Sequence, residues 1–268
     1  MNDRSLPYPL PADRTSPSSV PVIRRIGTDD LRAALALGWQ DFRAHPSQLF
    51  FLCIIYPVVA MIFWKFTAGY GVLPLFYPLV SGFALVGPIA AIGLYEISLQ
   101  RERGQPASWR NCFDVLRSPA LASIVVLALA LVAIFVVWIV IAQAIYQAAL
   151  GDVPISRMSD FLALLFDTPG GWFLIVCGNL VGLVFACIVL GITVVSFPMM
   201  LDRNADVGVA VRTSVQAVMR NPVVLALWGA IVGVLIMLGS LAAFVGLAIV
   251  LPVLGHATWH LYRRLIAA

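Results

Sequence analysis

The stretch LASIVVLALALVAIFVVWIVIAQAIYQAA, residues 121–149, contains no charged residue from end to end. A helix needs about 20 consecutive apolar residues to cross the hydrocarbon core of a bilayer. This stretch exceeds that length and is apolar on every side, so it predicts a helix that crosses a membrane.

Five further crossings are predicted on either side of this stretch. They lie at residues 49–66, 73–99 and 172–200, and as a pair within residues 223–261. The last run is too long for one crossing, so we expect two helices joined by a tight turn near Gly239 and Ser240. The fold class predicted is therefore an all-α polytopic membrane protein with about six transmembrane helices.

The composition supports a membrane protein. Of 268 residues, 61% are hydrophobic and 11% are charged, whereas soluble domains carry about 25% charged residues. We expect one six-helix transmembrane domain over residues 28–268. Residues 1–27 hold five prolines and no apolar signal-peptide core, which predicts a disordered cytoplasmic tail.

The basic residues predict an orientation. Of the 17 Lys and Arg residues, only Lys65 and Arg157 fall on the far side of the predicted crossings, so both termini are expected in the cytoplasm. The net charge of +4 reflects residues at the ends of apolar runs, and no nucleic-acid partner is expected. The four cysteines include no CxxC pair, which argues against a disulfide framework or a zinc site.

Three short amphipathic segments precede crossings on the cytoplasmic side, and each is predicted to lie in the membrane interface. They end alike, in FRAHP at Pro46, VLRSP at Pro119 and VMRNP at Pro222. Thr28 is predicted to cap the first. Their apolar faces are predicted at Leu31, Leu35, Gly38 and Phe42, at Trp109, Cys112, Phe113 and Leu116, and at Val207, Val211, Val215 and Val218.

Each return crossing also carries a late proline, at Pro88, Pro198 and Pro252. One interpretation is a threefold repeat of an interfacial helix followed by two crossings, related by an axis along the membrane normal. The other is convergence, because any chain that re-enters a membrane needs a corner of this kind.

His256 and His260 in HATWH are the first candidate site. A spacing of four places both on one helical face, which suits a metal or haem ligand pair. Their neighbours Trp259, Tyr262 and Arg263 fit an interface belt instead, in which the histidines have a structural role.

Glu96, Asn179 and Asp202 are the second candidate, a polar vestibule on a transport path. The alternative is structural: Glu96 reaches the interface or pairs with Arg101, and Asn179 joins packed helices. The sequence contains no phosphate loop, HExxH or GxSxG motif, so we expect no enzyme and no cofactor.

The chain resembles the bacterial membrane protein family catalogued as domain of unknown function 2189. The resemblance rests on FLCIIYPVV from Phe51, SGFALVGPIAAIGLYE ending at Glu96, VVSFPMMLDR ending at Arg203 and LPVLGHATWHLYR ending at Arg263. It implies a location in the bacterial inner membrane and no established activity.

Three functions are predicted for such a chain. The first is a non-catalytic accessory or scaffold component, whose partners are the lipid bilayer and another membrane protein complex. The alternatives are a small-molecule transporter or channel, and a haem or metal handling protein of the respiratory chain.

Overall fold

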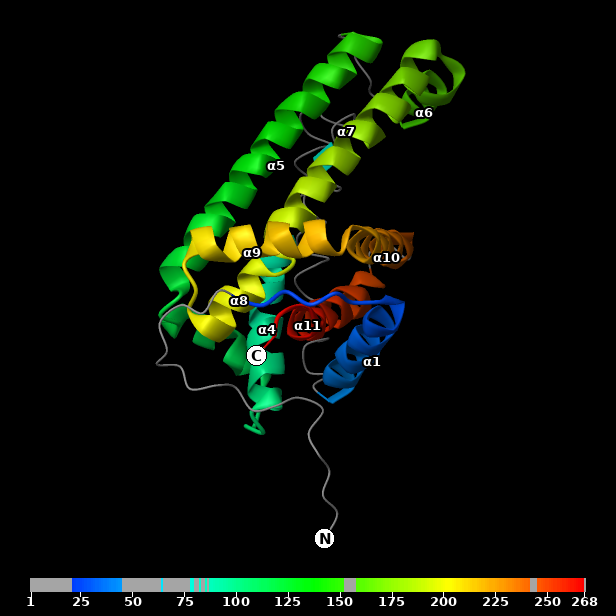
Figure 1. Cartoon of the computed structure of the whole chain (residues 1–268). Coiled ribbons are helices and arrows are strands. Elements are labelled where there is room, and N and C mark those ends of the chain that lie inside the picture. The colour runs from blue at the N-terminus through cyan, green and yellow to red at the C-terminus, as the bar shows by residue number, and fades with distance from the viewer. Residues whose placement is uncertain are drawn as a thin grey trace.

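The computed structural model describes residues 21–44, 64, 78–79, 82, 85, 87–151, 158–241 and 245–267. These residues are helical, apart from turns and one isolated β-bridge between Ile23 and Ile266. A pair of long helices extends away from a body of shorter helices (Figure 1).

The long pair is formed by α5 (Leu121–Leu150) and α7 (Pro169–Thr193), joined at their far end through α6 (Met158–Asp167). The crossing predicted at 121–149 is thus one continuous helix. Many of the large apolar side chains on both helices are exposed, among them Leu129 and Val140 on α5 and Leu180 and Leu183 on α7. Lipid or other apolar helices suit such a surface.

Three of the described helices are long and apolar enough to cross a membrane: Leu121–Leu150, Pro169–Arg203 and Pro222–Leu241. The crossing predicted at 49–66 lies outside the described residues, except for Trp64. The one predicted at 73–99 is described continuously only from Gly87. The described residues therefore show an all-helical protein with three candidate crossings.

The crossing predicted at 172–200 is divided near its end. The helix α7 ends at Thr193 and α8 runs over Ser196–Arg203. Proline lacks an N–H and clashes with the carbonyl four residues earlier. For Pro198 that residue is Val194, where the chain leaves α7. The Ser196 hydroxyl donates to the carbonyl of Ile192, which satisfies an acceptor at the break.

The last apolar stretch forms two helices, as predicted, α10 (Pro222–Leu241) and α11 (Leu247–Leu265). The turn comes later than the prediction near Gly239 and Ser240, because α10 continues to Leu241. Gly239 has a different role: a Cβ on Gly246 would lie 2.8 Å from the Gly239 Cα, so glycine lets these helix ends approach closely.

α10 also runs across the long pair. Figure 1 shows α10 nearly end-on, whereas α5 and α7 are seen from the side.

The prolines at two of the predicted corners behave as expected, because α5 begins soon after Pro119 and α10 begins at Pro222. The threefold repeat itself stays a prediction.

Two of the three amphipathic segments form α-helices. In α1 (Thr28–Ala44) the predicted face is largely buried, although Leu35 is half-buried and Asp41 joins it. Thr28 is the first residue of the helix and not the residue before it, and the Asp30 side chain reaches back to accept the Gly27 N–H. In α9 (Val207–Arg220) the buried face consists of Ala210, Thr213, Ser214 and Ala217, so the predicted valine face is rotated and Val215 is exposed.

The segment after Ser108 is a 3₁₀-helix, η3 (Trp109–Arg117). Its three-residue period aligns Cys112 with Val115, which is buried, and turns Phe113 and Leu116 outward. The face predicted from an α-helical period is therefore wrong at Phe113 and Leu116. A Cβ on Gly93 would lie 2.9 Å from the Cys112 Cβ, so η3 packs closely on the preceding helix.

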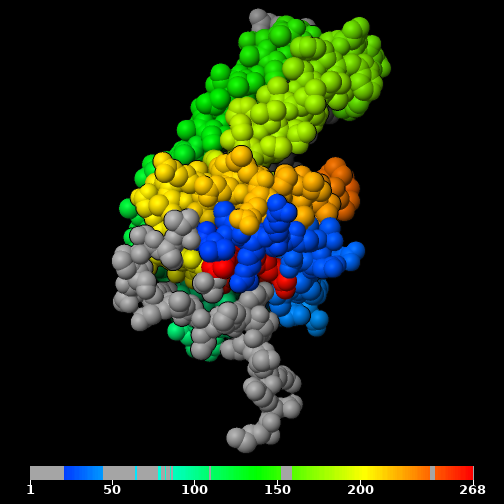
Figure 2. All heavy atoms as spheres, viewed as in Figure 1, coloured from blue at the N-terminus to red at the C-terminus, as the bar shows by residue number. Residues whose placement is uncertain are grey.

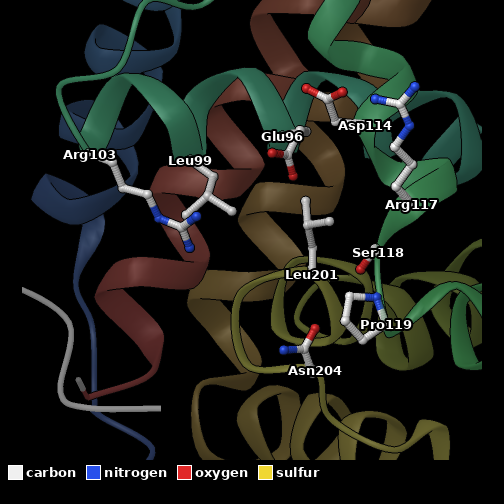
Figure 3. Close-up of a pocket in the computed structure, with 9 residues that line it drawn as sticks. All are labelled: Glu96, Leu99, Arg103, Asp114, Arg117, Ser118, Pro119, Leu201 and Asn204. Atoms are coloured by element: carbon white, nitrogen blue, oxygen red, sulfur yellow. The ribbon is translucent and has the colours of Figure 1, made fainter.

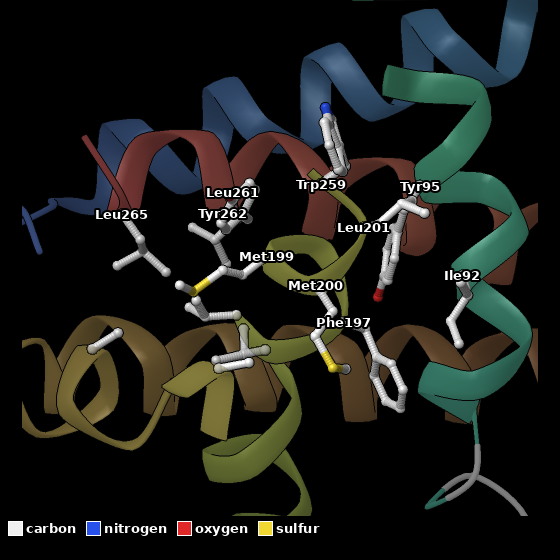
Figure 4. Packing of buried hydrophobic residues seen from close by; sticks show 14 of the residues in the cluster. Ile92, Tyr95, Phe197, Met199, Met200, Leu201, Trp259, Leu261, Tyr262 and Leu265 are labelled. Atoms are coloured by element: carbon white, nitrogen blue, oxygen red, sulfur yellow. The ribbon is translucent and has the colours of Figure 1, made fainter. Parts of the chain in front are cut away.

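α11 is the centre of the body. It lies against α1 and α4 (Gly87–Glu102), and Figure 4 shows Trp259 and Tyr262 of α11 near Met199 and Leu201 of α8. The contact with α1 is tight at Gly38, where a Cβ would lie 2.6 Å from the Ala257 backbone nitrogen. Most residues of α11 after Pro252 are buried, although one interpretation of the sequence placed the end of this helix in the membrane interface.

Residues 21–27 lie along the end of α11. Besides the bridge between Ile23 and Ile266, the Arg24 N–H donates to the Leu265 carbonyl at 2.7 Å, and the Ala267 N–H donates to the Val22 carbonyl at 2.9 Å. This part of the predicted tail therefore contacts the helical body, whereas residues 1–20 lie outside the described part of the chain.

Candidate functional site

The candidate site is built around Asp41, a carboxylate on the buried face of α1. Its Oδ2 accepts a hydrogen bond of 2.6 Å from the Ser98 hydroxyl of α4 and lies 2.9 Å from the His260 Nε2 of α11. Its Oδ1 forms an ion pair with Arg101 of α4. A single buried carboxylate thus joins three helices that are far apart in the sequence.

His256 completes this cluster. Its Nδ1 lies 2.7 Å from the Ser98 Oγ and 3.8 Å from the Asp41 Oδ2. A hydroxyl has one proton and an ionised carboxylate only accepts, so Ser98 donates to Asp41 and accepts from the His256 Nδ1–H. His260 donates to Asp41 through its Nε2–H. Ser98 and His260 thus donate directly to Asp41, and His256 donates to Ser98.

The surroundings keep Asp41 ionised. Burial alone raises its pKa, but hydrogen bonds from His260 and Ser98, together with the nearby histidines, oppose this effect and hold the pKa below its usual range. The charge of Arg101 balances the carboxylate. This pairing of opposite charges offsets part of the cost of burying the carboxylate.

Ser98, His256 and Asp41 do not form a hydrolytic triad. In such a triad the histidine lies between the serine and the aspartate and uses both ring nitrogens. Here Ser98 lies between the other two, and it is only 1% exposed. The geometry offers no accessible nucleophile, and its evident effect is to hold helices together.

A second polar cluster lies further along α11. Arg263 contacts Glu102 of α4 with two N–O distances of 2.9 Å and Asp202 of α8 at 3.0 Å. The Tyr262 hydroxyl also donates to Asp202, at 2.8 Å. The Trp259 Nε1–H donates to Glu102. The two clusters together connect α11 to α1, α4 and α8.

The structure brings His256 and His260 together on one face, as their spacing predicts, and places both against Asp41. The role as metal ligands stays a prediction. Among the described residues, no group of three or more His, Cys, Asp or Glu side chains is arranged to hold a metal ion. The His260 Nδ1 is buried and has no hydrogen-bond partner in the described part of the chain.

The three residues of the predicted vestibule lie in different places. Glu96 lines a small open pocket of about 140 Å³ beside Asp114 and Leu201 (Figure 3). Asp202 faces α11, and Asn179 lies on the exposed side of α7, where it donates to the carbonyl of Ile175. They share no cavity within the described ranges.

Glu96 does not form the ion pair with Arg101 that the structural alternative suggested. It accepts a hydrogen bond of 2.9 Å from Gln100, whereas Arg101 pairs with Asp41. The sequence reasoning missed Asp41 and Ser98 as members of a site. A signal existed for Asp41: Leu31, Ala34, Gly38 and Asp41 follow the alternating three- and four-residue spacing of a buried helix face.

These features define an all-helical membrane protein whose described polar clusters are buried around its C-terminal helix. Residues 75–202 match the family model described as a predicted integral membrane protein (DUF2189). The strings at residues 51–59 and 251–263 fall outside this match, and so do His256 and His260. No curated protein and no solved structure matches the chain.

Proposed function

We propose that this protein is a non-catalytic accessory or scaffold component of the bacterial inner membrane. One observation carries the proposal: the two polar clusters around α11 join helices to one another, while the long α5–α7 pair displays a broad apolar surface. Such a surface suits attachment to lipid and to the helices of a partner. Transport and metal handling are the alternatives, and no site assembled from the described residues supports either.

The outward side of α7 offers a contact point for a partner helix. A Cβ added at Gly178 would meet no atom within 4 Å, so this position is open. The next residue, Asn179, is polar and exposed between large apolar side chains such as Val176 and Leu183. Small residues and amides are the groups that membrane helices use to associate.

The charge distribution supports a cytoplasmic location for both termini. The sequence between α5 and α7 carries Asp152, Asp160 and Asp167 but only one arginine, Arg157. The body at the other end holds most of the arginines. The cytoplasmic side of a membrane protein is the one enriched in basic residues, so we place the body there.

Native mass spectrometry of the protein released from its own membrane in mild detergent tests the proposal. We expect the wild type to carry a second protein in fixed stoichiometry. Gly178→Leu should lose that protein because the added side chain fills the open position on α7. Gly191→Leu is the matched control, since its Cβ also meets no atom within 4 Å and it lies on a different side of the helix.

A wild-type spectrum that shows only the bare chain, its homo-oligomers and lipid would overturn the accessory role. If Gly178→Leu keeps the partner, the partner does not bind at Gly178 of α7. Equal loss of the partner from Gly178→Leu and Gly191→Leu would also refute this contact point.

A further inference from the structure

Asn221 holds two distant parts of the chain together. It lies in the corner between α9 and α10 and is buried. Its Oδ1 accepts the Ile26 N–H at 2.9 Å, and its Nδ2 donates to the Arg24 carbonyl at 3.0 Å. These groups are separated by 195 and 197 residues in the sequence. The N-terminal segment is thereby fixed beside the corner.

This arrangement gathers three arginines. Arg24 and Arg25 lie on the fixed segment and Arg220 directly precedes Asn221, and all three are exposed. None of the three has an ion-pair partner among the described residues.

The nearest acids of the same segment are already engaged. Asp29 pairs with Arg32, and Asp30 pairs with Arg264. The positive charge of the three arginines is therefore uncompensated within the described part of the chain.

Exposed apolar residues lie next to the arginines along the chain. Met219 is 75% exposed and Val223 is 78% exposed, and Val22 on the N-terminal segment is exposed as well. Figure 2 shows the N-terminal segment, in blue, directly against α9, in yellow and orange, on one face of the molecule. We name this surface the corner patch: Val22, Arg24, Arg25, Met219, Arg220 and Val223.

We infer that the corner patch binds the phosphate groups of anionic lipids at the membrane surface. Pro222 begins α10, one of the three candidate crossings, so the patch lies at the water-facing end of an apolar helix. Arginines at that level meet lipid phosphates, and the apolar side chains between them reach the upper part of the acyl chains. A nucleic acid or an acidic peptide matches the charge but leaves the apolar side chains in water.

The test measures lipid retention by the purified full-length chain in a neutral detergent. Phosphatidylglycerol or phosphatidylcholine with the same acyl chains is added, and native mass spectrometry counts the bound molecules. The wild type should prefer phosphatidylglycerol. In the triple variant Arg24→Gln/Arg25→Gln/Arg220→Gln this preference should be weaker. It should fall about fivefold for each arginine removed, or on the order of a hundredfold in all.

The matched control is Arg32→Gln/Arg43→Gln/Arg110→Gln, which removes the same charge from exposed arginines elsewhere. It should keep the wild-type preference, which shows that position and not net charge is responsible. Melting temperatures of both variants verify that they are folded.

Three results would overturn the inference. The first is an unchanged preference in the corner-patch variant. The second is an equal loss in both triple variants. The third is displacement of phosphatidylglycerol by inorganic phosphate at equal concentration, which would identify the patch as a site for the free anion. The accessory role is tested separately, because it concerns a protein mass and α7.

Discussion

Replacing Asp41 by asparagine tests whether the buried cluster stabilises the fold. Asparagine has nearly the same shape, but it removes the charge and exchanges one acceptor oxygen for a donor NH₂. In the structure both carboxylate oxygens accept, from Ser98 and His260 at one and from Arg101 at the other. The variant therefore leaves a buried donor facing donors and leaves Arg101 without its counter-charge.

The expected cost follows from this loss. Breaking a buried ion pair by removing one partner costs about 3–5 kcal/mol. For a chain of this size each kcal/mol lowers the melting temperature by about 2–4 °C. Asp41→Asn should therefore melt on the order of 10 °C below the wild type, as measured by tryptophan fluorescence of the detergent-solubilised protein at pH 7.

The pH dependence of stability gives a second measurement on the same variant. Because hydrogen bonds hold the folded-state pKa of Asp41 below its usual range, its contribution is complete above about pH 4, the unfolded pKa. It is lost as the pH falls through the lower folded-state pKa. The wild type should therefore lose stability on acidification more steeply than Asp41→Asn does.

Asp29→Asn is the control, since this carboxylate lies on the same helix but is exposed and pairs only with Arg32. We expect a change of about 0–1 kcal/mol. An Asp41→Asn protein that melts with the wild type, and with the same acid profile, would refute the view that the cluster holds α1, α4 and α11 together.

Two further predictions concern close packing and thiol reactivity. Gly38→Ala should lower the free energy of unfolding by about 1–3 kcal/mol, because its Cβ would overlap the backbone of α11, whereas Gly27→Ala should be silent because nothing lies within 4 Å. Thermal melts of both variants check this, and equal melting temperatures would contradict it. Burial, with the charges of Asp114 and Glu96, raises the pKa of the Cys112 thiol to about 11, so it stays protonated at neutral pH. Alkylation by iodoacetamide at pH 8 should be slow in the folded protein and fast in the unfolded one, and a fast reaction in the folded state would count against this burial.

The apolar runs were predictable because long uncharged stretches have few alternatives to a membrane helix. This reasoning located α5 and the beginnings of α7 and α10 within about three residues. It failed where two effects compete, as at residues 172–200, where composition favours one helix and Pro198 interrupts it. It also failed at η3, where a 3₁₀ period exposes Phe113 instead of burying it.

The polar clusters were harder to predict because they depend on contacts between distant segments. The predicted apolar face of its helix does not include Asp41, and a buried charge is rare without a partner. Its partners are Ser98 and Arg101 some 60 residues away and His260 at the far end of the chain. His256 and His260 were recognised as a pair, but only the fold shows that they share a carboxylate.

The contact between residues 22–24 and 265–267 limits how the chain can be threaded through a membrane. Segments joined by backbone hydrogen bonds lie on the same side of the bilayer, so the number of passages between Ile23 and Ile266 is even. The candidates α5, α7 and α10 would make three passages, which is an odd number. One crossing, or another odd number of crossings, must therefore be added to these three or removed from them. Either another segment of the chain crosses, or one of the three lies along the surface, and α10 runs across the other two. Reporter proteins fused at the two ends must therefore give the same compartment.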